Sequence, residues 1–230
     1  MAYFDARHLP PPSNEYVAWI DVMGIQTAMS RSIQIAANFV FKLHIAALEA
    51  KTNGITLYPV MDGVYVTSQN KKEMESFLRS MFADLAKVFV KEGKERLLFL
   101  IRGAISFGEI YHGRNVGKGA SATLGSNLDY QSHILLGEPM INSHLGERNA
   151  PPFGIFVHSS ARGENSSVGP DGWWRWFEGV STIDRESIGK KCSSYFNWCY
   201  ECRDEIKYDL DRILVHKGLA ELYFASRLVG

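Results

Sequence analysis

Apolar residues recur at helical spacing in two long stretches, and these constrain the fold more than any other feature of the sequence. The first covers residues 26 to about 51, and the second covers residues 71–94. Helical periodicity on one face predicts that each stretch packs against a larger apolar surface. In the first stretch we expect one buried stripe, made by Ile33, Ala36, Ala37, Val40, Phe41, Ile45 and Leu48.

Strand-like runs lie before, between and after these two helices. Residues 16–20 form a short apolar run, and residues 97–110 are typical of one long or bent strand. Between the helices, two β-rich runs flank Asp62-Gly63, a dipeptide that is favoured in two-residue hairpin turns. The order βαββαβ is the ferredoxin-like arrangement, in which two helices cover one face of an antiparallel sheet.

The remaining sequence adds further elements to this core. In chain order it predicts a mobile loop at 113–127, a short helix at 137–147, strands at 153–158 and 173–177, and, beyond Ser187, one or two helices that extend to Leu228. No linker or shift of composition divides the chain, so a single domain spanning residues 1–230 is expected. Its class is α+β: a ferredoxin-like βαββαβ core with additional C-terminal strands and helices.

The charge balance argues against several kinds of partner. The chain has 25 basic and 25 acidic residues and no run of like charges, which is untypical of a protein that grips a long nucleic acid. Polar residues interrupt its apolar stretches before they reach the ~20 residues of a membrane span. The N-terminus lacks the basic start and apolar core of a secretory signal. We therefore expect a cytoplasmic protein that binds neither nucleic acid nor membrane.

Three cysteines, Cys192, Cys199 and Cys202, lie in one helix-like segment. An odd number argues against a disulfide framework and favours free thiols. Cys199 and Cys202 have a spacing that can ligate zinc, but a second pair is missing.

Other candidate functional residues have simple structural explanations. A lone histidine such as His112 more often makes structural hydrogen bonds than acts as an acid or base, and the tryptophans of residues 173–176 indicate core or a dimer contact.

Two aspartates are placed where a ferredoxin-like sheet would bring them together. Asp21 directly follows the apolar run 16–20, and Asp62 lies at the tip of the hairpin. Two carboxylates that converge near a backbone carbonyl, here that of Val22, form a hard oxygen site suited to Mg²⁺ or Mn²⁺ carrying a triphosphate. Each aspartate also has a simpler interpretation, because Asp21 can cap the next helix and Asp62 can merely make a turn.

Four motifs resemble, in the right order, those of class III nucleotide cyclase domains. Residues 20–25 (IDVMGI) resemble the signature that opens these domains, and Asp62 falls where the family has its second metal aspartate. Residues 101–108 (IRGAISFG) resemble the strand whose arginine, here Arg102, contacts substrate phosphates.

The fourth motif, residues 136–147, resembles the glycine-led helix that carries a transition-state asparagine. Asn142 would take this role, although the strict position holds Ile141 and the arginine expected four residues later is Leu145. The four matches lie within residues 15–147.

This resemblance implies a reaction and an assembly. Class III cyclases convert a nucleoside triphosphate to a 3′,5′-cyclic monophosphate and pyrophosphate with two Mn²⁺ or Mg²⁺ ions per active site. Asp21, Val22 and Asp62 would hold the metals, and Arg102 and Asn142 would act on the substrate. The resemblance also implies a homodimer with active sites at the interface, where metal ligands of one chain face helix residues of the other.

The positions that read the base in adenylate cyclases differ in this chain. Their lysine is replaced by Thr56 and their aspartate by Ile134. Tyr58 would narrow the base pocket and offers a phenol, which favours a pyrimidine triphosphate, UTP ahead of CTP. By the alternation of side chains along a strand, Tyr58 and Asp62 would face the same side if the strand stays regular to its tip. An ordinary strand aromatic would give the same pattern.

Small stand-alone cyclases with such a pocket resemble the pyrimidine (uridylate or cytidylate) cyclases of bacterial Pycsar anti-phage defence. There the product, cyclic UMP or cyclic CMP, activates a separate effector. Two alternatives stay open: a purine cyclase with a rearranged base pocket, and a catalytically silent cyclase-like module that binds a nucleotide or a partner. Retention of Asp21 and Asp62 argues against the silent module, and the shifted register of Asn142 argues for it.

Overall fold

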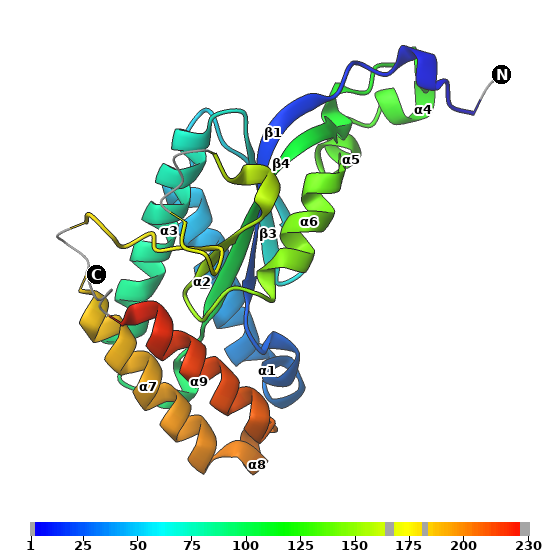
Figure 1. Ribbon diagram of the computed structural model, residues 1–230. Helices are drawn as coiled ribbons and strands as arrows, with labels where there is room; N and C mark the ends of the chain where they lie inside the picture. The colour runs from blue at the N-terminus through cyan, green and yellow to red at the C-terminus, as the bar shows by residue number, and fades with distance from the viewer. Residues whose placement is uncertain (1–2, 164–167, 181–183, 226–230) are drawn as a thin grey trace.

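A computed structural model of the protein describes residues 3–163, 168–180 and 184–225 (Figure 1). Its centre is a seven-stranded sheet in the order β2-β3-β1-β4-β6-β7, with β5 paired to the C-terminal end of β4. The strands are β1 (Ser13–Val22), β2 (Thr56–Val60), β3 (Gly63–Ser68), β4 (Ile101–His112), β5 (Leu135–Leu136), β6 (Ile155–Val157) and β7 (Trp173–Trp174). All pairs are antiparallel except β4 with β6.

Helices cover both faces and one end of this sheet. The α-helices are α1 (Ile25–Arg31), α2 (Ile33–Ala50), α3 (Lys71–Lys91), α4 (Ala122–Gly125), α5 (Leu128–Ser132), α6 (Glu138–Glu147), α7 (Arg185–Glu201), α8 (Arg203–Ile206) and α9 (Leu210–Phe224). Four 3₁₀ turns are η1 (Ala6–His8), η2 (Glu95–Leu97), η3 (Gly113–Asn115) and η4 (Ser159–Ala161). The predicted α+β class, with a βαββαβ core followed by C-terminal strands and helices, is confirmed.

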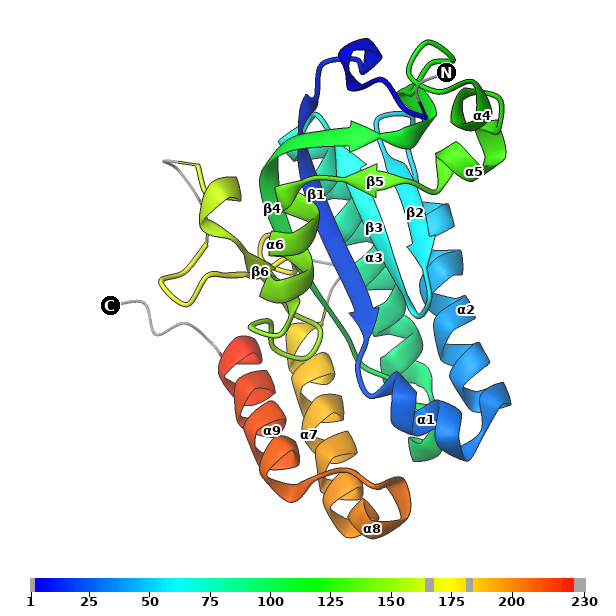
Figure 2. The ribbon, with the colours of Figure 1, turned by 90° about the vertical axis from the view of Figure 1, so that its right-hand side faces the viewer.

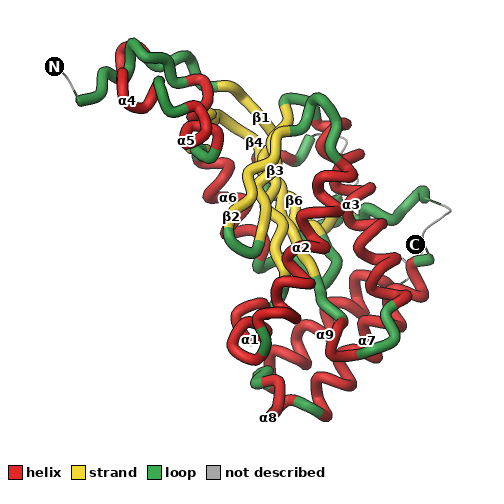
Figure 3. Tube along the Cα trace, turned by 180° about the vertical axis from the view of Figure 1, so that it is seen from behind, coloured by secondary structure: helices red, strands yellow, loops and turns green. Residues whose placement is uncertain are grey.

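Side chains alternate between two apolar layers along β1. Ala18, Ile20 and Val22 join the main core beneath α2 and α3, whereas Val17 and Trp19 join a smaller cluster on the other face. Helix α6 lies on this second face, opposite α2 and α3 (Figures 2 and 3), and its His144 packs 5.3 Å from the ring of Trp19. The sheet is therefore buried on both faces near its centre.

The C-terminal helices lie at the end of the sheet where β1 stops. There α7 and α9 run side by side, with α8 between them in sequence (Figure 2). The segment that leads to them carries Trp176, which is fully buried and donates a hydrogen bond of 2.7 Å to the carbonyl of Phe153. Trp174 is also buried, so the tryptophan cluster belongs to the core. The three cysteines are free thiols, as expected.

The prediction of the first long helix is wrong in two respects. The segment forms two helices, because Ser32 takes an extended conformation (φ −158°) and its side chain caps α2 by accepting a hydrogen bond from the amide of Ile35. The buried face of α2 is also a different one: Ala36, Phe39, Leu43, Ala46, Ala47 and Ala50. Of the predicted stripe, Ile33, Phe41, Ile45 and Leu48 are 54–64% exposed. Alanines permit close approach to the sheet, and apolar residues on several sides of one helix make its periodicity ambiguous.

Helix α2 is also long and apolar enough to cross a membrane by length and composition, and 28% of it is buried within the structure. One helix of this kind is weak evidence, because a core helix of a globular protein passes the same test.

The hairpin and strand boundaries differ from the prediction by a few residues. The β2–β3 turn is Met61-Asp62, since Val60 pairs with Gly63 and Met61 takes the positive φ of 53°. Gly63 is needed for another reason: a Cβ there would lie 2.4 Å from the ring of Trp19. Strand β4 begins at Ile101 rather than at 97, and the predicted mobile loop at 113–127 contains η3 and α4.

Candidate active site

Asp21 lies near the end of β1, on the face of the sheet that α6 covers. Its direct neighbours across the sheet are Gly63 on β3 and Arg102 on β4, so these three residues share one face. Asp62 immediately precedes Gly63 in the hairpin turn. The hairpin and the two central strands thus bring Asp21, Asp62 and Arg102 to one end of the sheet.

Asp21 has no role as a helix cap, which removes its simpler interpretation. The strand is longer than predicted, so Asp21 sits inside β1, and Gly24 is the N-cap of α1. Its carboxylate oxygen Oδ1 is buried and has no hydrogen-bond partner in the described part of the chain. Such a group costs free energy unless a cation or a ligand meets it.

Helix α6 adds a third carboxylate that sequence reasoning missed. Glu147, the last residue of the helix, is 7% exposed and accepts a hydrogen bond from Nε of Arg102. The terminal nitrogens of Arg102 make no hydrogen bond within the described residues. Glu147 therefore orients the guanidinium and leaves its outer edge available to a ligand.

The electrostatics of this cluster follow from burial and from like charges. Burial, together with the carboxylates of Asp62 and Glu147, raises the pKa of the Asp21 carboxyl to about 7, and the backbone amide of Val22 and Arg102 partly offset this rise. Burial likewise raises the pKa of Glu147, against the lowering effect of Arg102. Three carboxylates facing one arginine leave an excess of negative charge, and a cation at this place would relieve it.

The donor set fits a magnesium- or manganese-type ion. Asp21 and Asp62 supply hard oxygens, and the adjacent Val22 has its side chain in the core, so only its backbone can face the cluster. In the described residues no three acidic, histidine or cysteine side chains form a ready metal cage. A Mg²⁺ ion is commonly held by one or two carboxylates plus substrate phosphates, and Asp21 and Asp62 would supply the carboxylates.

A cavity of about 830 Å³ opens beside Asp21 and Arg102. Its walls come from α1, the segment before β4, and the C-terminal helices α7–α9. It is large enough for a drug-sized or nucleotide-sized ligand, and of the three carboxylates of the cluster Asp21 lines it.

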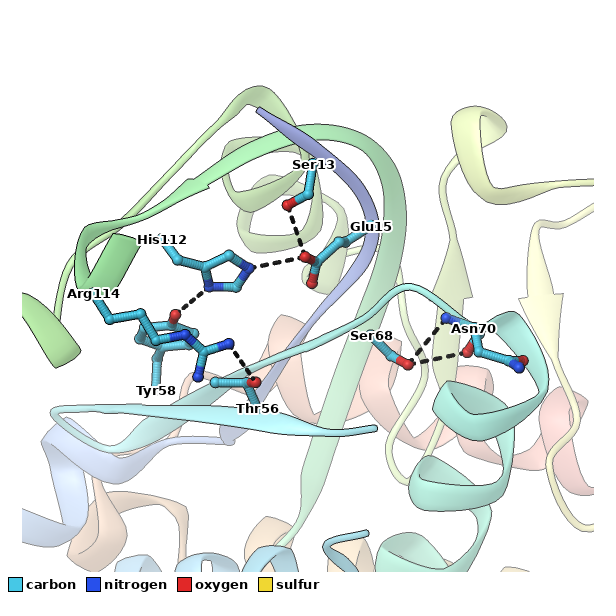
Figure 4. A network of polar contacts seen from close by, with 8 residues as sticks. All are labelled: Ser13, Glu15, Thr56, Tyr58, Ser68, Asn70, His112 and Arg114. Atoms are coloured by element: carbon cyan, nitrogen blue, oxygen red, sulfur yellow. Dashed lines mark hydrogen bonds and ion pairs between the residues drawn. The ribbon is translucent and has the colours of Figure 1, made fainter. Parts of the chain in front are cut away.

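A second polar cluster lies on the same sheet face, toward the start of β1 (Figure 4). The Tyr58 hydroxyl bonds Nδ1 of His112, whose Nε2 lies 2.9 Å from Oε1 of Glu15, and Ser13 donates to the same oxygen at 2.8 Å. All three of Tyr58, His112 and Glu15 are at most 6% exposed. His112 therefore makes structural hydrogen bonds, and the Tyr58 hydroxyl is already engaged.

This cluster makes the stability of the fold depend on pH in acid. Burial by itself would raise the pKa of Glu15, but the hydrogen bonds from His112 and Ser13 outweigh it and hold the pKa at about 2, below the ordinary 4.5. A lowered pKa stabilises the fold above pH 4.5, and this contribution is lost as the pH falls toward 2. Between pH 7 and pH 3, urea unfolding of the wild type should lose about 2 kcal/mol more than unfolding of Glu15→Gln. Equal losses in the two proteins would show that the carboxylate is not held in this way.

Comparisons with known proteins place this site in a recognised fold. No family model and no curated protein matches the chain. Two solved structures of bacterial light-regulated adenylyl cyclases match with TM-scores of 0.53 and 0.51, at 12% and 15% identity. The first match covers 68% of this chain and 46% of the other, and the second covers 66% and 79%.

The chain has the fold of a nucleotide cyclase domain. The guanylyl cyclase domain of the RhoGC fusion protein from the aquatic fungus Blastocladiella emersonii also matches, at 12% identity and a TM-score of 0.48, over 66% of this chain and 84% of that one. Within this cyclase fold, the carboxylates of Asp21 and Asp62 lie at the ends of the central strands.

Asn142 lies elsewhere in the cyclase fold. It projects from the middle of α6, where its Nδ2 donates to Oε1 of Glu138 at 3.3 Å, and it lines a separate groove with Pro139 and His158. Asn142 does not line the cavity of Asp21. Within one chain, the residue of α6 that reaches the carboxylates is Glu147. The neighbouring Ile141 and Leu145 are 56% and 49% exposed.

The two positions that would read a purine base lie close together in space. Arg114, just after β4, donates to Oγ1 of Thr56 at 3.2 Å, and the adjacent Gly113 amide bonds the carbonyl of Ile134 at 2.9 Å. Tyr58 follows on the same face of β2. The polar group that this edge offers to solvent is thus the guanidinium of Arg114, which sequence reasoning passed over because it lies in the glycine-rich segment.

Proposed function

We propose that this chain is a nucleotide cyclase that converts a nucleoside triphosphate to a 3′,5′-cyclic monophosphate and pyrophosphate. The observation that carries the proposal is the carboxylate cluster: Asp21, whose buried Oδ1 has no hydrogen-bond partner among the described residues, next to Asp62, on a sheet with the cyclase fold. A silent module has no need to maintain two neighbouring like charges, because their repulsion costs free energy.

In this reaction the ribose 3′-oxygen attacks the α-phosphorus, its proton is lost to solvent, and the bond from that phosphorus to the bridging oxygen of pyrophosphate breaks. Two Mg²⁺ or Mn²⁺ ions held by Asp21, Asp62 and the carbonyl of Val22 would supply charge neutralisation and a lower pKa for the 3′-hydroxyl. Arg102, held by Glu147, orients the phosphates through its free terminal nitrogens. The surrounding protein keeps these charges in place before the reaction begins.

A second copy of the chain completes the site in this proposal. Asn142 lies outside the cavity of Asp21 within its own chain, so it can act as a catalytic residue only on the substrate of a partner. The exposed Ile141 and Leu145 on the same helix offer apolar surface for that contact. A homodimer with two equivalent sites satisfies both observations.

For the base we propose a pyrimidine, UTP ahead of CTP. Thr56 and Ile134 offer no pair of polar groups to read adenine. The edge of the sheet beside Thr56 presents Arg114, a donor that suits the carbonyl oxygens of uracil. The Tyr58 ring narrows the space at this edge. Its hydroxyl is hydrogen-bonded to His112 and is therefore not available to the base. The product would be read by a separate effector, as in the anti-phage systems that the sequence resembles. A guanine O6 can also accept from Arg114, so a purine cyclase is the second candidate.

Initial rates with UTP, CTP, ATP and GTP, each with Mn²⁺, test the choice of base. We expect UTP to be the fastest substrate and Arg114→Ala to lower its kcat/KM by about tenfold or more, the cost of one charge-assisted contact. Arg7→Ala, which removes an exposed arginine paired with Asp5, is the matched control. Faster cyclisation of ATP or GTP would refute the pyrimidine assignment and leave the cyclase proposal standing.

A further inference from the structure

The cavity beside Asp21 is built in large part by helices that carry none of the cyclase-like motifs. Those motifs end at residue 147, whereas α7, α8 and α9 contribute one whole wall of the cavity. The wall includes Lys207, Arg212 and His216, and the same cavity is lined by Asp21 and Arg102. The C-terminal helices thus line the same cavity as Asp21 and Arg102.

The lining is rich in cations, although the whole chain has a formal net charge of zero. The cavity contains the basic residues Arg31, Lys94, Arg96, Arg102, Lys207 and Arg212, and the acidic residues Asp21, Glu95, Glu205 and Asp209. Two of the cations have carboxylate partners, Arg31 with Glu205 at 3.3 Å and Arg102 with Glu147. A concave site lined by an excess of one charge concentrates ligands of the opposite charge.

Arg212 is the cation with the clearest freedom to bind a ligand. Its backbone amide is held by the N-cap Asp209 at 3.1 Å, which fixes where the side chain leaves α9. Its guanidinium makes no hydrogen bond or ion pair with any described residue. A guanidinium in a concave site, fixed at its root and free at its tip, matches phosphate oxygens bidentately.

Arg212 and Arg102 act on the same part of the cavity. Both guanidinium groups are close enough to influence His216, which lines the same cavity and is bonded to the Tyr208 hydroxyl through Nδ1 at 2.6 Å. Burial, with smaller contributions from the positive charges of Arg102 and Arg212, lowers the pKa of His216 to about 4. The imidazole of His216 is therefore neutral near pH 7. The positive charge in this part of the cavity comes from the guanidinium groups of Arg102 and Arg212.

We propose that the C-terminal helices form an oligophosphate-binding wall, in which Arg212 binds the β- and γ-phosphates of the substrate and the pyrophosphate that leaves. This inference rests on the proposed function for the identity of the substrate, but the wall itself binds inorganic pyrophosphate whether or not the chain cyclises nucleotides. It assigns to the motif-free third of the chain a direct part in substrate binding.

Calorimetric titration with inorganic pyrophosphate and Mg²⁺ tests the wall without relying on catalysis. Wild-type protein should bind, Arg212→Ala should bind at least about tenfold more weakly, and Arg212→Lys should recover only part of the loss, because lysine lacks the bidentate geometry. Arg203→Ala is the matched control, since Arg203 lies on α8 over the ring of Tyr200 and outside the cavity. It should bind as the wild type does.

Thermal unfolding of each variant checks that the fold is kept. Binding that is absent in the wild type, unchanged in Arg212→Ala, or equally reduced in Arg203→Ala would overturn the inference. If the chain cyclises nucleotides while Arg212→Ala leaves pyrophosphate binding and KM unchanged, the inference fails and the proposed function stands. If pyrophosphate binding depends on Arg212 and no triphosphate is cyclised, the proposed function fails and the wall stands.

Discussion

Asp21→Asn and Asp62→Asn should each lower the rate of cyclic nucleotide formation by about a hundredfold or more. Asparagine keeps the shape of each side chain but removes the negative charge that a cation between the two aspartates needs. At Asp21 the change also relieves the repulsion from Asp62 and Glu147, so the fold should be no less stable. Loss of activity with equal or higher thermal stability is the combination that separates a catalytic carboxylate from a structural one.

The control for charge removal is Asp84→Asn on α3. Asp84 is exposed and its carboxylate pairs with Lys87 at 2.8 Å, so its loss should change neither turnover nor stability appreciably. If Asp21→Asn or Asp62→Asn turned over substrate at close to the wild-type rate, the two residues would not be metal ligands for the reaction, and the proposed site would be wrong.

Arg102→Ala should destabilise the fold by roughly 3 kcal/mol, because it leaves the buried carboxylate of Glu147 without its partner. The side chains are 20% and 9% exposed, so water cannot replace the guanidinium fully. Adding Glu147→Gln to Arg102→Ala should restore a large part of this loss, since the second change removes the unpaired charge. Urea unfolding of the wild type, both single variants and the double variant measures the coupling.

Activity follows a different pattern in the same four proteins. Arg102→Ala and the double variant should both be nearly inactive, because restored stability does not restore a phosphate contact. Glu147→Gln alone should keep part of the activity, since Arg102 remains but is less firmly oriented. Additive stability effects, with no recovery in the double variant, would contradict a coupled pair.

The order of elements was predictable because strands and helices differ in period. The apolar runs on β1 and β4 and the helical spacing of α3 each have one dominant pattern, and the βαββαβ order follows from them. The antiparallel pairing of β1 between β3 and β4 then places Asp21 beside Arg102. The place of Asp21 at the end of its strand followed from the order of elements, whereas Arg102 was predicted from the resemblance of residues 101–108 to a cyclase motif.

The errors lie where one local pattern permits two structures. Helix α2 has apolar residues on several sides, so spacing alone could not decide that Phe39 is buried and Phe41 exposed. The hairpin turn moved by one residue because contact with Trp19, far away in the sequence, requires Gly63 inside the strand. Local turn propensity does not depend on such a long-range contact, so it could not predict the shift.

The site residues that sequence analysis missed can be recognised only from tertiary contacts. Glu147 closes α6 and Arg212 lies in α9, and neither belongs to a spacing that indicates chemistry. Each becomes significant only because packing places it by Arg102 or in the cavity of Asp21. That His112 engages the Tyr58 hydroxyl could not be predicted either, because the two residues are far apart in the sequence.

The most direct test of the account is product analysis by ³¹P NMR and mass spectrometry after incubation of the purified protein with each of the four ribonucleoside triphosphates and Mn²⁺. The account predicts one 3′,5′-cyclic monophosphate and one pyrophosphate per triphosphate consumed, and neither product from Asp21→Asn. Wild-type protein that consumes none of the four, or that releases only linear mono- or diphosphates, would contradict the assignment of this site to nucleotide cyclisation.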